Sequence, residues 1–338
     1  MGPARYLVFT KTLKLPARGK ILLCANILCL DPNSRFMKKK RILIVGYPHF
    51  ARKLCQGLKK VDKRNSYFTL NTYWNRWHRM ISPLYLLRAD VLYSLNGTLS
   101  NSGLMNLAFK WNKRVIIHWM GTDVTKAIAK VENNDVDERY IHAEHYTVAP
   151  WLREELSTIG IDAKELSIAA QEANIEIKPF PKKFTVLTYL PENRADFYGK
   201  PALIQAAKTF PEIDFIVVGD LKPFEGAPSN VEFKGWTKHV DPFIESSVAL
   251  MRFMEHDGMS YMVIDTLARG RYVLYNRNFH GVEYVQTLDE LMDAIASLKK
   301  QFDAGTLPLN KETAARVQVD FSEEALMNKV KDIINLKE

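Results

Sequence analysis

The sequence predicts an α/β protein with two Rossmann-like, doubly wound domains that face a central cleft. From Met37 onward, strand-like and helix-like segments alternate, which is the pattern of a parallel sheet covered by helices. Two prolines and two lysines between Pro179 and Lys183 interrupt both periodicities, so we expect the linker there. At 338 residues, 47% hydrophobic and 25% charged, the chain is long enough for two globular domains.

The first half opens with a buried strand-like run, Arg41–Val45, which ends at Gly46. Apolar residues at helical spacing follow it, which begins the strand–helix alternation of this class. The further elements expected in this half are strands at 90–95, 115–118 and 147–148, and helices at 50–60, 102–111 and 151–159. We therefore expect residues 37–178 to form an N-terminal domain.

The second half repeats the alternation with its own first strand, Phe184–Tyr189. The elements expected after it are strands at 213–218, 231–233, 248–251 and 272–275, and helices at 201–209, 288–302 and 322–336. Residues 183–320 are expected to form a C-terminal domain. The last segment, 321–338, is expected to be a helix that packs back toward the N-terminal domain.

The first 36 residues are expected to lie outside the fold. They carry six basic residues, one acid and a ten-residue apolar run, Ile21–Leu30, which is too short to span a bilayer. No small-x-small cleavage site follows this run, and Met37 reads like a natural start placed directly before a first strand. An upstream-extended start or a disordered leader fits these features, with a membrane-touching amphipathic arm as the alternative.

The three cysteines, Cys24, Cys29 and Cys55, show no metal-ligand spacing with histidines. All three lie in the first sixth of the chain, so their placement does not indicate a disulfide framework. A reducing compartment, the cytoplasm, is therefore expected.

The most informative segment of the C-terminal half runs from a strand through a loop into a helix. The loop carries Asp257 and Gly258, a helix is expected from near Ser260, and Asp265 lies within that helix. Open α/β sheets bind ligands outside the carboxyl ends of their strands, and helix N-termini offer free N–H groups to phosphate. Carboxylates accept hydrogen bonds from hydroxyls, so the segment predicts a site for a nucleotide joined to a sugar. An ordinary βαβ unit with a solvated aspartate is the alternative.

A second motif lies in the N-terminal half, where a strand ends at His118. A turn containing Gly121 follows, and Asp123 stands at the start of the next helix. The position of His118 at the carboxyl end of a strand predicts that it faces the cleft. A buried structural histidine is the alternative, and helix capping is the alternative for Asp123.

These two motifs resemble those of retaining GT-B glycosyltransferases of the family-4 (glycosyl transferases group 1) type. Asp257 and Asp265 stand where that family has glutamates, and Ala268-Arg269-Gly270 follows in register. The stretch from His118 to Asp123 is similar to the family's His-x-x-Gly-Ser/Thr-Asp element. The resemblance implies the GT-B fold, with the acceptor at the N-terminal domain and the donor at the C-terminal one. It also implies transfer of a sugar from a nucleotide-sugar with retention at the anomeric carbon.

The resemblance assigns catalytic roles to four residues. His118 would contact the transferred sugar, and Asp123 would organise the cleft or reach the acceptor. Asp257 would accept hydrogen bonds from the sugar, and Arg194 would neutralise the donor diphosphate, for which a planar guanidinium is suited.

The donor-binding residues implied by the resemblance are Gly258, Met259, Ser260, Asp265, Lys200 and Gly46. Backbone N–H groups of the Gly258–Ser260 turn would bind the diphosphate, and Asp265 would bind the ribose. Tyr198 occupies the position of the family's phosphate-binding lysine, so Lys200 or Lys222 would substitute for it. Gly46 turns the chain where the family has a glycine-rich loop.

No metal or other cofactor is expected for this chemistry. Asp135-Val-Asp137 spells the Asp-x-Asp motif of metal-dependent transferases of another fold. It lies in an acidic run from Glu132 to Glu138 rather than after a strand, so we interpret it as coincidental.

The charge is distributed unevenly. Residues 37–114 contain 16 Lys/Arg and two acids, whereas residues 151–338 contain 22 Lys/Arg and 29 Asp/Glu. Aromatics lie among the basic residues, as in Tyr73-Trp74-Asn75-Arg76-Trp77. This predicts a peripheral contact with an anionic membrane, at the inner face of the cell membrane. A solvated basic face and a nucleic-acid or polyanion surface are alternatives; no nucleic-acid motif is present.

Two function classes follow. The first is a glycosyltransferase that acts on a lipid-linked or polysaccharide acceptor in the biosynthesis of a glycolipid or cell-envelope polysaccharide. The second is a non-catalytic GT-B-like protein that binds a sugar nucleotide or a partner. The aspartates in place of glutamates and the missing lysine are compatible with the second class.

Overall fold

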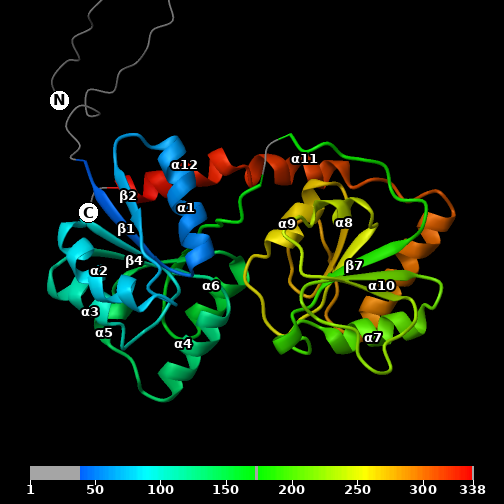
Figure 1. Ribbon diagram of the computed structural model, residues 1–338, viewed down its shortest axis with the longest axis horizontal. Coiled ribbons are helices and arrows are strands. Elements are labelled where there is room, and N and C mark those ends of the chain that lie inside the picture. Colours follow the sequence, from blue (N-terminus) through cyan, green and yellow to red (C-terminus); the bar gives the residue numbers. More distant parts are fainter. Residues whose placement is uncertain (1–38, 172–173, 337–338) are drawn as a thin grey trace, which may run out of the picture. The chain divides into compact units, whose positions relative to one another are not determined.

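Two parallel six-stranded sheets form the framework of the chain (Figure 1). The computed structural model describes residues 39–171 and 174–336. The predictions for residues 1–36 fall outside this set, as do Cys24 and Cys29. Residues from Lys39 onward belong to one compact unit. The predicted architecture of two doubly wound α/β sheets is confirmed.

The first sheet has the strand order β2-β1-β3-β4-β5-β6. Its strands β1, β3 and β4 are almost entirely buried runs of apolar residues, as expected where helices cover both faces of a parallel sheet. The strands are β1 (Arg41–Gly46), β2 (Ser66–Thr69), β3 (Val91–Leu95), β4 (Arg114–Trp119), β5 (Glu144–Thr147) and β6 (Ala163–Glu165). The helices are α1 (Pro48–Val61), α2 (Arg76–Arg88), α3 (Gly103–Lys110), α4 (Thr122–Glu132), α5 (Glu138–Ile141) and α6 (Pro150–Ser157).

The second sheet has the order β12-β11-β10-β7-β8-β9. Its strands are β7 (Thr185–Tyr189), β8 (Asp214–Val218), β9 (Val231–Gly235), β10 (Ala249–Arg252), β11 (Tyr272–Tyr275) and β12 (Glu283–Tyr284). Its helices are α7 (Lys200–Thr209), α8 (Asp241–Glu245), α9 (Tyr261–Ala268) and α10 (Leu288–Asp303), with a 3₁₀ turn η2 (Glu192–Arg194). The linker prediction falls in the irregular stretch just before β7.

The strand orders locate the switch points at which such sheets bind ligands. In the first sheet the order reverses at β1 and β3, and in the second it reverses at β7 and β10. Crossovers leave a sheet on opposite faces at such a point, which opens a crevice outside the carboxyl ends of the two strands. A ligand site is therefore expected at the segments after β1, β7 and β10.

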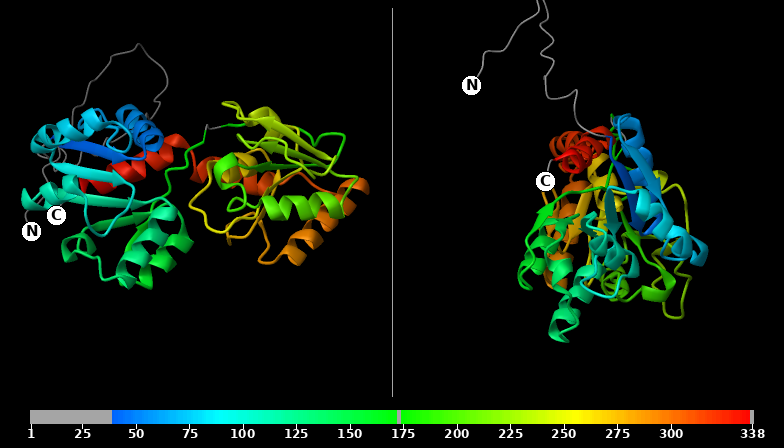
Figure 2. Two further views of the ribbon diagram at one scale, coloured as in Figure 1. Left: turned by 60° about the horizontal axis from the view of Figure 1, so that its bottom comes forward. Right: turned by 90° about the vertical axis from the view of Figure 1, so that its left-hand side faces the viewer.

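The chain crosses between the two sheets twice. The first crossing contains Gln171 and the second joins α11 (Lys311–Asp320) to α12 (Glu323–Asn335). The two crossings are hydrogen-bonded: Gln171 N donates to Phe321 O at 2.8 Å, and Glu323 N donates to Gln171 O at 3.1 Å. Beyond the second crossing, α12 packs against α1 (Figures 1 and 2).

One buried arginine ties the end of α12 to the first sheet. Arg114, at the start of β4, donates to the carbonyls of Ile333 and Ile334 at 3.0 and 2.9 Å and pairs with Glu144 of β5. The last carbonyls of a helix lack partners within the helix, so the guanidinium satisfies groups that would otherwise need water. The end of α12 is thereby held beside β4.

None of the helices in residues 39–171 and 174–336 combines the length and apolar character required to cross a bilayer.

Arg114→Leu is expected to lower the free energy of unfolding by about 1–3 kcal/mol, because buried carbonyls and Glu144 lose their donor. Urea unfolding followed by circular dichroism measures this change. The matched control is Arg153→Leu, whose exposed pair with Glu165 spans 3.8 Å and contributes about 0–1 kcal/mol. Equal losses in the two variants would contradict the anchoring role.

Candidate active site

A cavity of about 750 Å³ lies at the switch points of both sheets. Tyr47 after β1 and the turn after β4 line it from the first sheet. From the second sheet the lining comes from Tyr189 at the end of β7, Arg252 at the end of β10, and the loop that leads into α9. The cavity therefore occupies the place that strand order predicts for a ligand.

The cavity brings together half of the residues selected from the sequence. Those that line it are Arg194, Asp257, Gly258, Met259 and Ser260. Those that do not line it are His118, Asp123, Asp265, Lys200 and Gly46. The five residues that line the cavity lie on loops that follow strands. Most of the other five are enclosed within or between secondary-structure elements.

Asp257 is held in a buried ion pair. Its Oδ2 accepts from Arg252 Nε at 2.5 Å and from Tyr275 OH at 2.9 Å, and its Oδ1 accepts from Arg252 Nη2 at 3.0 Å. Burial opposes the charge of Arg252, but the Asp257 carboxylate outweighs this and leaves the pKa of Arg252 above its usual value. Asp257 thus fixes an arginine at the carboxyl end of β10, and both of its oxygens are already engaged.

Arg194 provides a second guanidinium in the same cavity. It is exposed, lies 3.9 Å from the ring of Phe197 by cation–π contact, and forms no ion pair with any residue that the structure describes. Stacking on an aromatic ring leaves the edge of a guanidinium free to donate hydrogen bonds. Arg194 and Arg252 therefore give the cavity two sites of fixed positive charge suited to phosphate oxygens.

The backbone of the loop before α9 contacts the turn after β4 directly. A Cβ on Gly258 would lie 1.9 Å from Met120 O, and one on Gly121 would lie 3.0 Å from Gly258 N. Trp151 Nε1 also donates to Asp257 O at 2.7 Å. Glycine is required at 258 because the two backbones approach too closely for any side chain.

The helix that follows this loop begins with open donors. Ser260 is the N-cap of α9, and its side chain makes no capping hydrogen bond. The first N–H groups of a helix have no partner within it and attract anions. Met259 and Ser260 line the cavity, so the N–H groups at the start of α9 and the two arginines face the same space.

Tyrosines form much of the remaining wall. The Tyr47 and Tyr73 rings lie 5.4 Å apart, and those of Tyr189 and Tyr198 lie 5.7 Å apart. Burial, with the nearby carboxylate of Asp123, raises the pKa of Tyr47 to about 12, so its hydroxyl stays protonated at neutral pH. Aromatic faces with hydroxyl edges suit the flat apolar surfaces and hydroxyl groups of sugars and bases.

His118 does not face the cavity, which corrects the prediction from its position in the strand. Its side chain is completely buried; Nδ1 is 2.8 Å from Tyr93 OH, and Nε2 is 2.8 Å from Leu166 O. Burial lowers the pKa of His118 to about 4, so the ring is neutral. With both ring nitrogens occupied, the histidine links strands of the first sheet.

The buried carboxylate of Asp123 is surrounded by backbone N–H groups. It accepts hydrogen bonds from the N–H groups of Gly97, Met120 and Gly121 at 2.7–3.0 Å. Burial raises the pKa of Asp123, and these donors oppose that shift. Asp123 therefore fixes the turn after β4; its predicted role in organising the cleft or reaching the acceptor stays a prediction.

Gly46 and Lys200 also make local structural contacts outside the cavity. A Cβ on Gly46, whose φ is +107°, would lie 2.2 Å from Leu95 O, so glycine lets β1 end tightly against β3. Lys200 pairs with Asp196 at 3.0 Å, and Lys222 pairs loosely with Glu192 at 3.9 Å. Neither lysine lines the cavity, so neither replaces the missing phosphate-binding lysine.

Asp265 lies on α9 one turn after Tyr261 but is turned toward Arg269, whose Nη1 is 3.5 Å from Oδ1. Arg269 in turn pairs with Asp241 of α8 at 2.8 Å. Burial raises the pKa of Asp265 to about 6, with Asp241 adding to the shift and Arg269 opposing it. The predicted contact of Asp265 with a ribose in this cavity is not supported by the geometry.

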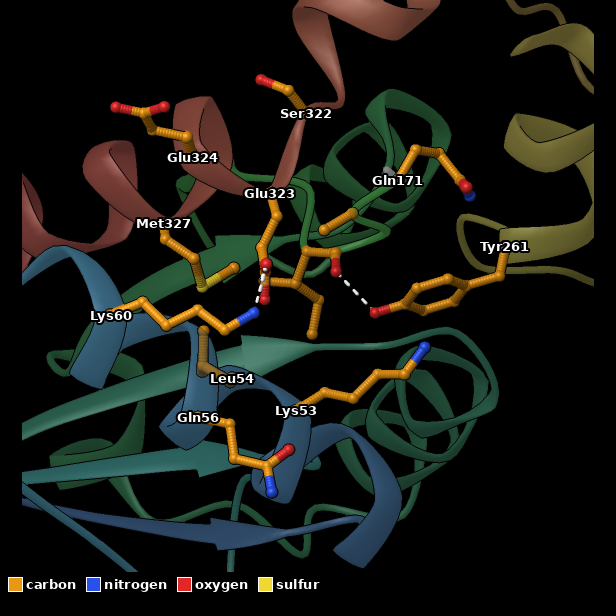
Figure 3. A pocket seen from close by; sticks show the side chains of 12 residues that line it. Lys53, Leu54, Gln56, Lys60, Gln171, Tyr261, Ser322, Glu323, Glu324 and Met327 are labelled. Carbon is orange, nitrogen blue, oxygen red and sulfur yellow. Dashed lines mark hydrogen bonds and ion pairs between the residues drawn. The ribbon is translucent and has the colours of Figure 1, made fainter. Parts of the chain in front are cut away.

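A second cavity, of about 830 Å³, is shown in Figure 3. It shares the lining residues Tyr261 and Ile168 with the first cavity. It is lined by α1, the first crossing and the start of α12. Lys60 pairs with Glu323 at 2.6 Å across one side, and Tyr261 OH donates to Ile168 O at 2.6 Å. Lys53 lies 4.5 Å from the Tyr261 ring. This cavity lies at the crossings rather than at strand ends.

Within the described ranges, no cluster of three or more His, Cys, Asp or Glu side chains has an arrangement suited to a metal ion. Asp135 pairs with Lys130 at 2.6 Å, and Asp137 caps α5 and pairs with Arg139 at 2.6 Å. Both carboxylates of the Asp-x-Asp sequence therefore have local structural partners.

The lining residues that the sequence analysis did not select include Tyr47, Arg252 and His256. Arg252 carried a usable signal, because it ends a strand five residues before Asp257. Tyr47 follows the first strand at its switch point. His256 Nε2 lies 2.8 Å from Glu155 Oε2 of α6, a contact between distant segments that no local pattern reveals.

Comparison with known proteins gives a likeness in structure. No family model matches the sequence, and no curated protein matches it. Among solved structures, a glycosyltransferase from Rickettsia africae ESF-5 aligns with a TM-score of 0.61 and 13% identity, over 88% of this chain and 98% of that one. The sucrose-phosphate synthase of Thermosynechococcus elongatus aligns with a TM-score of 0.58 and 13% identity, over 88% and 98%.

The pneumococcal O-GlcNAc transferase GtfA aligns with a TM-score of 0.50 and 12% identity over 72% of this chain. The chain spans 56% of the GtfA chain. At these identities the likeness shows the fold alone, and that fold is the predicted GT-B architecture.

Asp265→Asn is expected to raise the free energy of unfolding at pH 7 by up to about 3 kcal/mol. The folded-state pKa of about 6 lies above the ordinary value of 3.8, so stability is lost as pH rises through that window. The gain should therefore shrink as pH falls toward 4. Denaturant unfolding at several pH values measures it.

The matched control is Asp320→Asn, an exposed carboxylate paired with Arg316 at 3.4 Å, which should change little. A gain that is the same at pH 4 and pH 7 would contradict the assignment of burial as the cause.

Proposed function

We propose that this protein is a glycosyltransferase that moves a sugar from a nucleotide-sugar donor to a lipid-linked or polysaccharide acceptor. The observation that carries the proposal is that Arg194 and Arg252 line the same cavity. The N-terminus of α9, which has no side-chain cap, lies at that cavity too. A diphosphate needs fixed positive charge and N–H donors, and this cavity offers both at the strand ends of a GT-B fold. The tyrosine walls offer surfaces for the sugar and base.

In this proposal the donor's diphosphate lies between the two guanidinium groups and the Gly258–Ser260 turn. As the sugar leaves, negative charge grows on the diphosphate, and donors already in place stabilise it without reorganisation. Asp257 contributes by holding Arg252 in position through two hydrogen bonds. Because these cationic groups supply the counter-charge, we propose a metal-independent transfer.

Retention of anomeric configuration is proposed on the resemblance of the Asp257–Gly258 segment to retaining transferases. Asp257 is the lining carboxylate among the described residues, and Arg252 and Tyr275 occupy its oxygens. It is therefore not arranged as a base for the acceptor hydroxyl. Product stereochemistry, read by proton NMR of the anomeric coupling, tests this part of the proposal.

The structural neighbours indicate which donors to test first. GtfA is described in complex with UDP and GlcNAc, so UDP-sugars are the first donors to test here. The basic N-terminal half suits an anionic, lipid-linked acceptor, and we propose a cytoplasmic location at the inner face of the cell membrane. Cell-envelope polysaccharide biosynthesis is the corresponding role.

A non-catalytic sugar-nucleotide-binding protein is the second candidate. It is favoured by Tyr198, which stands where the resemblance expects a lysine, and by the engagement of Asp257 in an internal pair. Such a protein would bind the nucleotide-sugar and leave it intact. Release of nucleoside diphosphate in the presence of membrane extract separates the two candidates.

Arg194→Ala is expected to weaken donor binding by about 10- to 100-fold, because a charge-assisted hydrogen bond contributes about 1.5–3 kcal/mol. Thermal shift and calorimetric titration with UDP-, GDP- and ADP-sugars measure the loss. Arg194 is exposed, so the variant should fold normally.

Arg316→Ala on α11 is the matched control, as an exposed arginine outside the cavity. Donor affinity unchanged by Arg194→Ala would refute the assignment of the phosphate site. Donor binding without turnover under any acceptor condition would leave the second candidate standing.

A further inference from the structure

The outer side of α2 carries a stripe of exposed apolar side chains. Trp77, Met80, Leu84 and Leu87 have 60–73% of their surface exposed. At 100° per residue they fall within an arc of about 100° on one side of the helix. Soluble surfaces scatter such residues singly, so four in one stripe indicate a contact surface.

The same helix already has an inner face that attaches it to the protein. Ser82 and Leu86 are buried, and they lie on the side opposite the stripe. The apolar residues of α2 are thus more numerous than its packing requires. The outer stripe has no partner among the described residues, and folding of this chain does not explain it.

The stripe continues toward the cavity. Trp74, 75% exposed, lies in the turn before α2, with its ring centroid 4.6 Å from that of Tyr73. Tyr73 lines the cavity, and its ring centroid lies 5.4 Å from that of Tyr47. Arg79 donates to Tyr73 O at 3.1 Å and to Thr72 O at 3.2 Å, which holds this turn against the helix.

The charge around the stripe has one sign. Between residues 63 and 122 the sequence contains a single acid, Asp90. Arg76 and Arg88 are exposed at the two ends of α2 and form no ion pair with any described residue. Lys113 reaches the end of the helix and donates to Leu87 O at 3.3 Å.

We propose that the α2 face, defined as Trp74, Trp77, Met80, Leu84 and Leu87, docks into the headgroup region of an anionic membrane leaflet. Tryptophan and aliphatic side chains enter the interface, and flanking basic residues bind the anionic headgroups. The positive rim selects an anionic lipid surface over a neutral one. It also disfavours a second copy of this face, because two such rims would repel one another.

This docking gives the cavity a membrane-facing rim at Tyr73. That consequence rests on the proposed transferase function, since it would bring a lipid-linked acceptor to the cavity without leaving the leaflet. The docking itself needs no enzymatic activity, so the two proposals can fail separately.

The test is co-sedimentation of the full-length protein with vesicles of phosphatidylcholine and phosphatidylglycerol, compared with pure phosphatidylcholine. Wild type should bind the anionic vesicles and release as salt rises. The double variant Trp77→Ser/Leu84→Ser should bind at least about tenfold more weakly, because the apolar contact is lost. Arg76→Ser/Arg88→Ser should also weaken binding and flatten the salt dependence.

Trp236→Ser is the matched control, since Trp236 is 71% exposed after β9 and lies outside the α2 face. It should bind vesicles as wild type does. Circular dichroism and thermal unfolding should be unchanged in all these variants, and donor binding should be unchanged in Trp77→Ser/Leu84→Ser. Loss of donor binding by Arg194→Ala with intact vesicle binding would separate the docking from the transferase proposal.

Four results would overturn the docking. The first is equal sedimentation of wild type and Trp77→Ser/Leu84→Ser. The second is equal sedimentation of wild type with neutral and anionic vesicles. The third is loss of binding through Leu23→Asp alone, which would assign the contact to the apolar run Ile21–Leu30. The fourth is a wild-type dimer that Trp77→Ser/Leu84→Ser converts to a monomer while vesicle binding persists.

Discussion

The buried carboxylate of Asp123 is the constraint on which the candidate site depends. By accepting hydrogen bonds from three backbone N–H groups, it fixes the turn between β4 and α4. Met120 O of that turn lies against Gly258, which belongs to the loop from β10 to α9. The loop in turn presents Asp257 to Arg252. One internal carboxylate thus sets the backbone on which the charges of the cavity are arranged.

Asp257 and Asp265, the two acids of the predicted donor motif, both pair with arginines in the structure. Asp257 orients Arg252, and Asp265 lies near Arg269. Arg252, at the carboxyl end of β10, is thus held by a carboxylate of the loop that follows the strand, whereas Arg269 lies at the end of α9. This explains why the cavity combines a positive character with an acidic motif, and why Arg194, which has no such carboxylate, is exposed and held by Phe197.

Sequence alone predicted the two-sheet architecture and most strands, because buried parallel strands are continuous apolar runs such as Ile42–Val45. It gave no expectation for α2, whose apolar residues occupy opposite sides and whose interior contains Pro83, so no single periodicity emerges. At the site, residues tied to strand ends, such as Arg194 and Asp257, were predictable. The enclosure of His118 was not, because strand position does not tell whether the next layer of structure covers a side chain.

The paired crossings at Gln171 and Phe321–Glu323 have a mechanical consequence. A single connecting segment would act as a swivel and allow the two sheets to turn about any axis. Two segments joined by backbone hydrogen bonds restrain one another, because neither can rotate independently while Gln171 stays bonded to Phe321 and Glu323. A rotation of one sheet against the other must therefore either move both segments together or break these two hydrogen bonds.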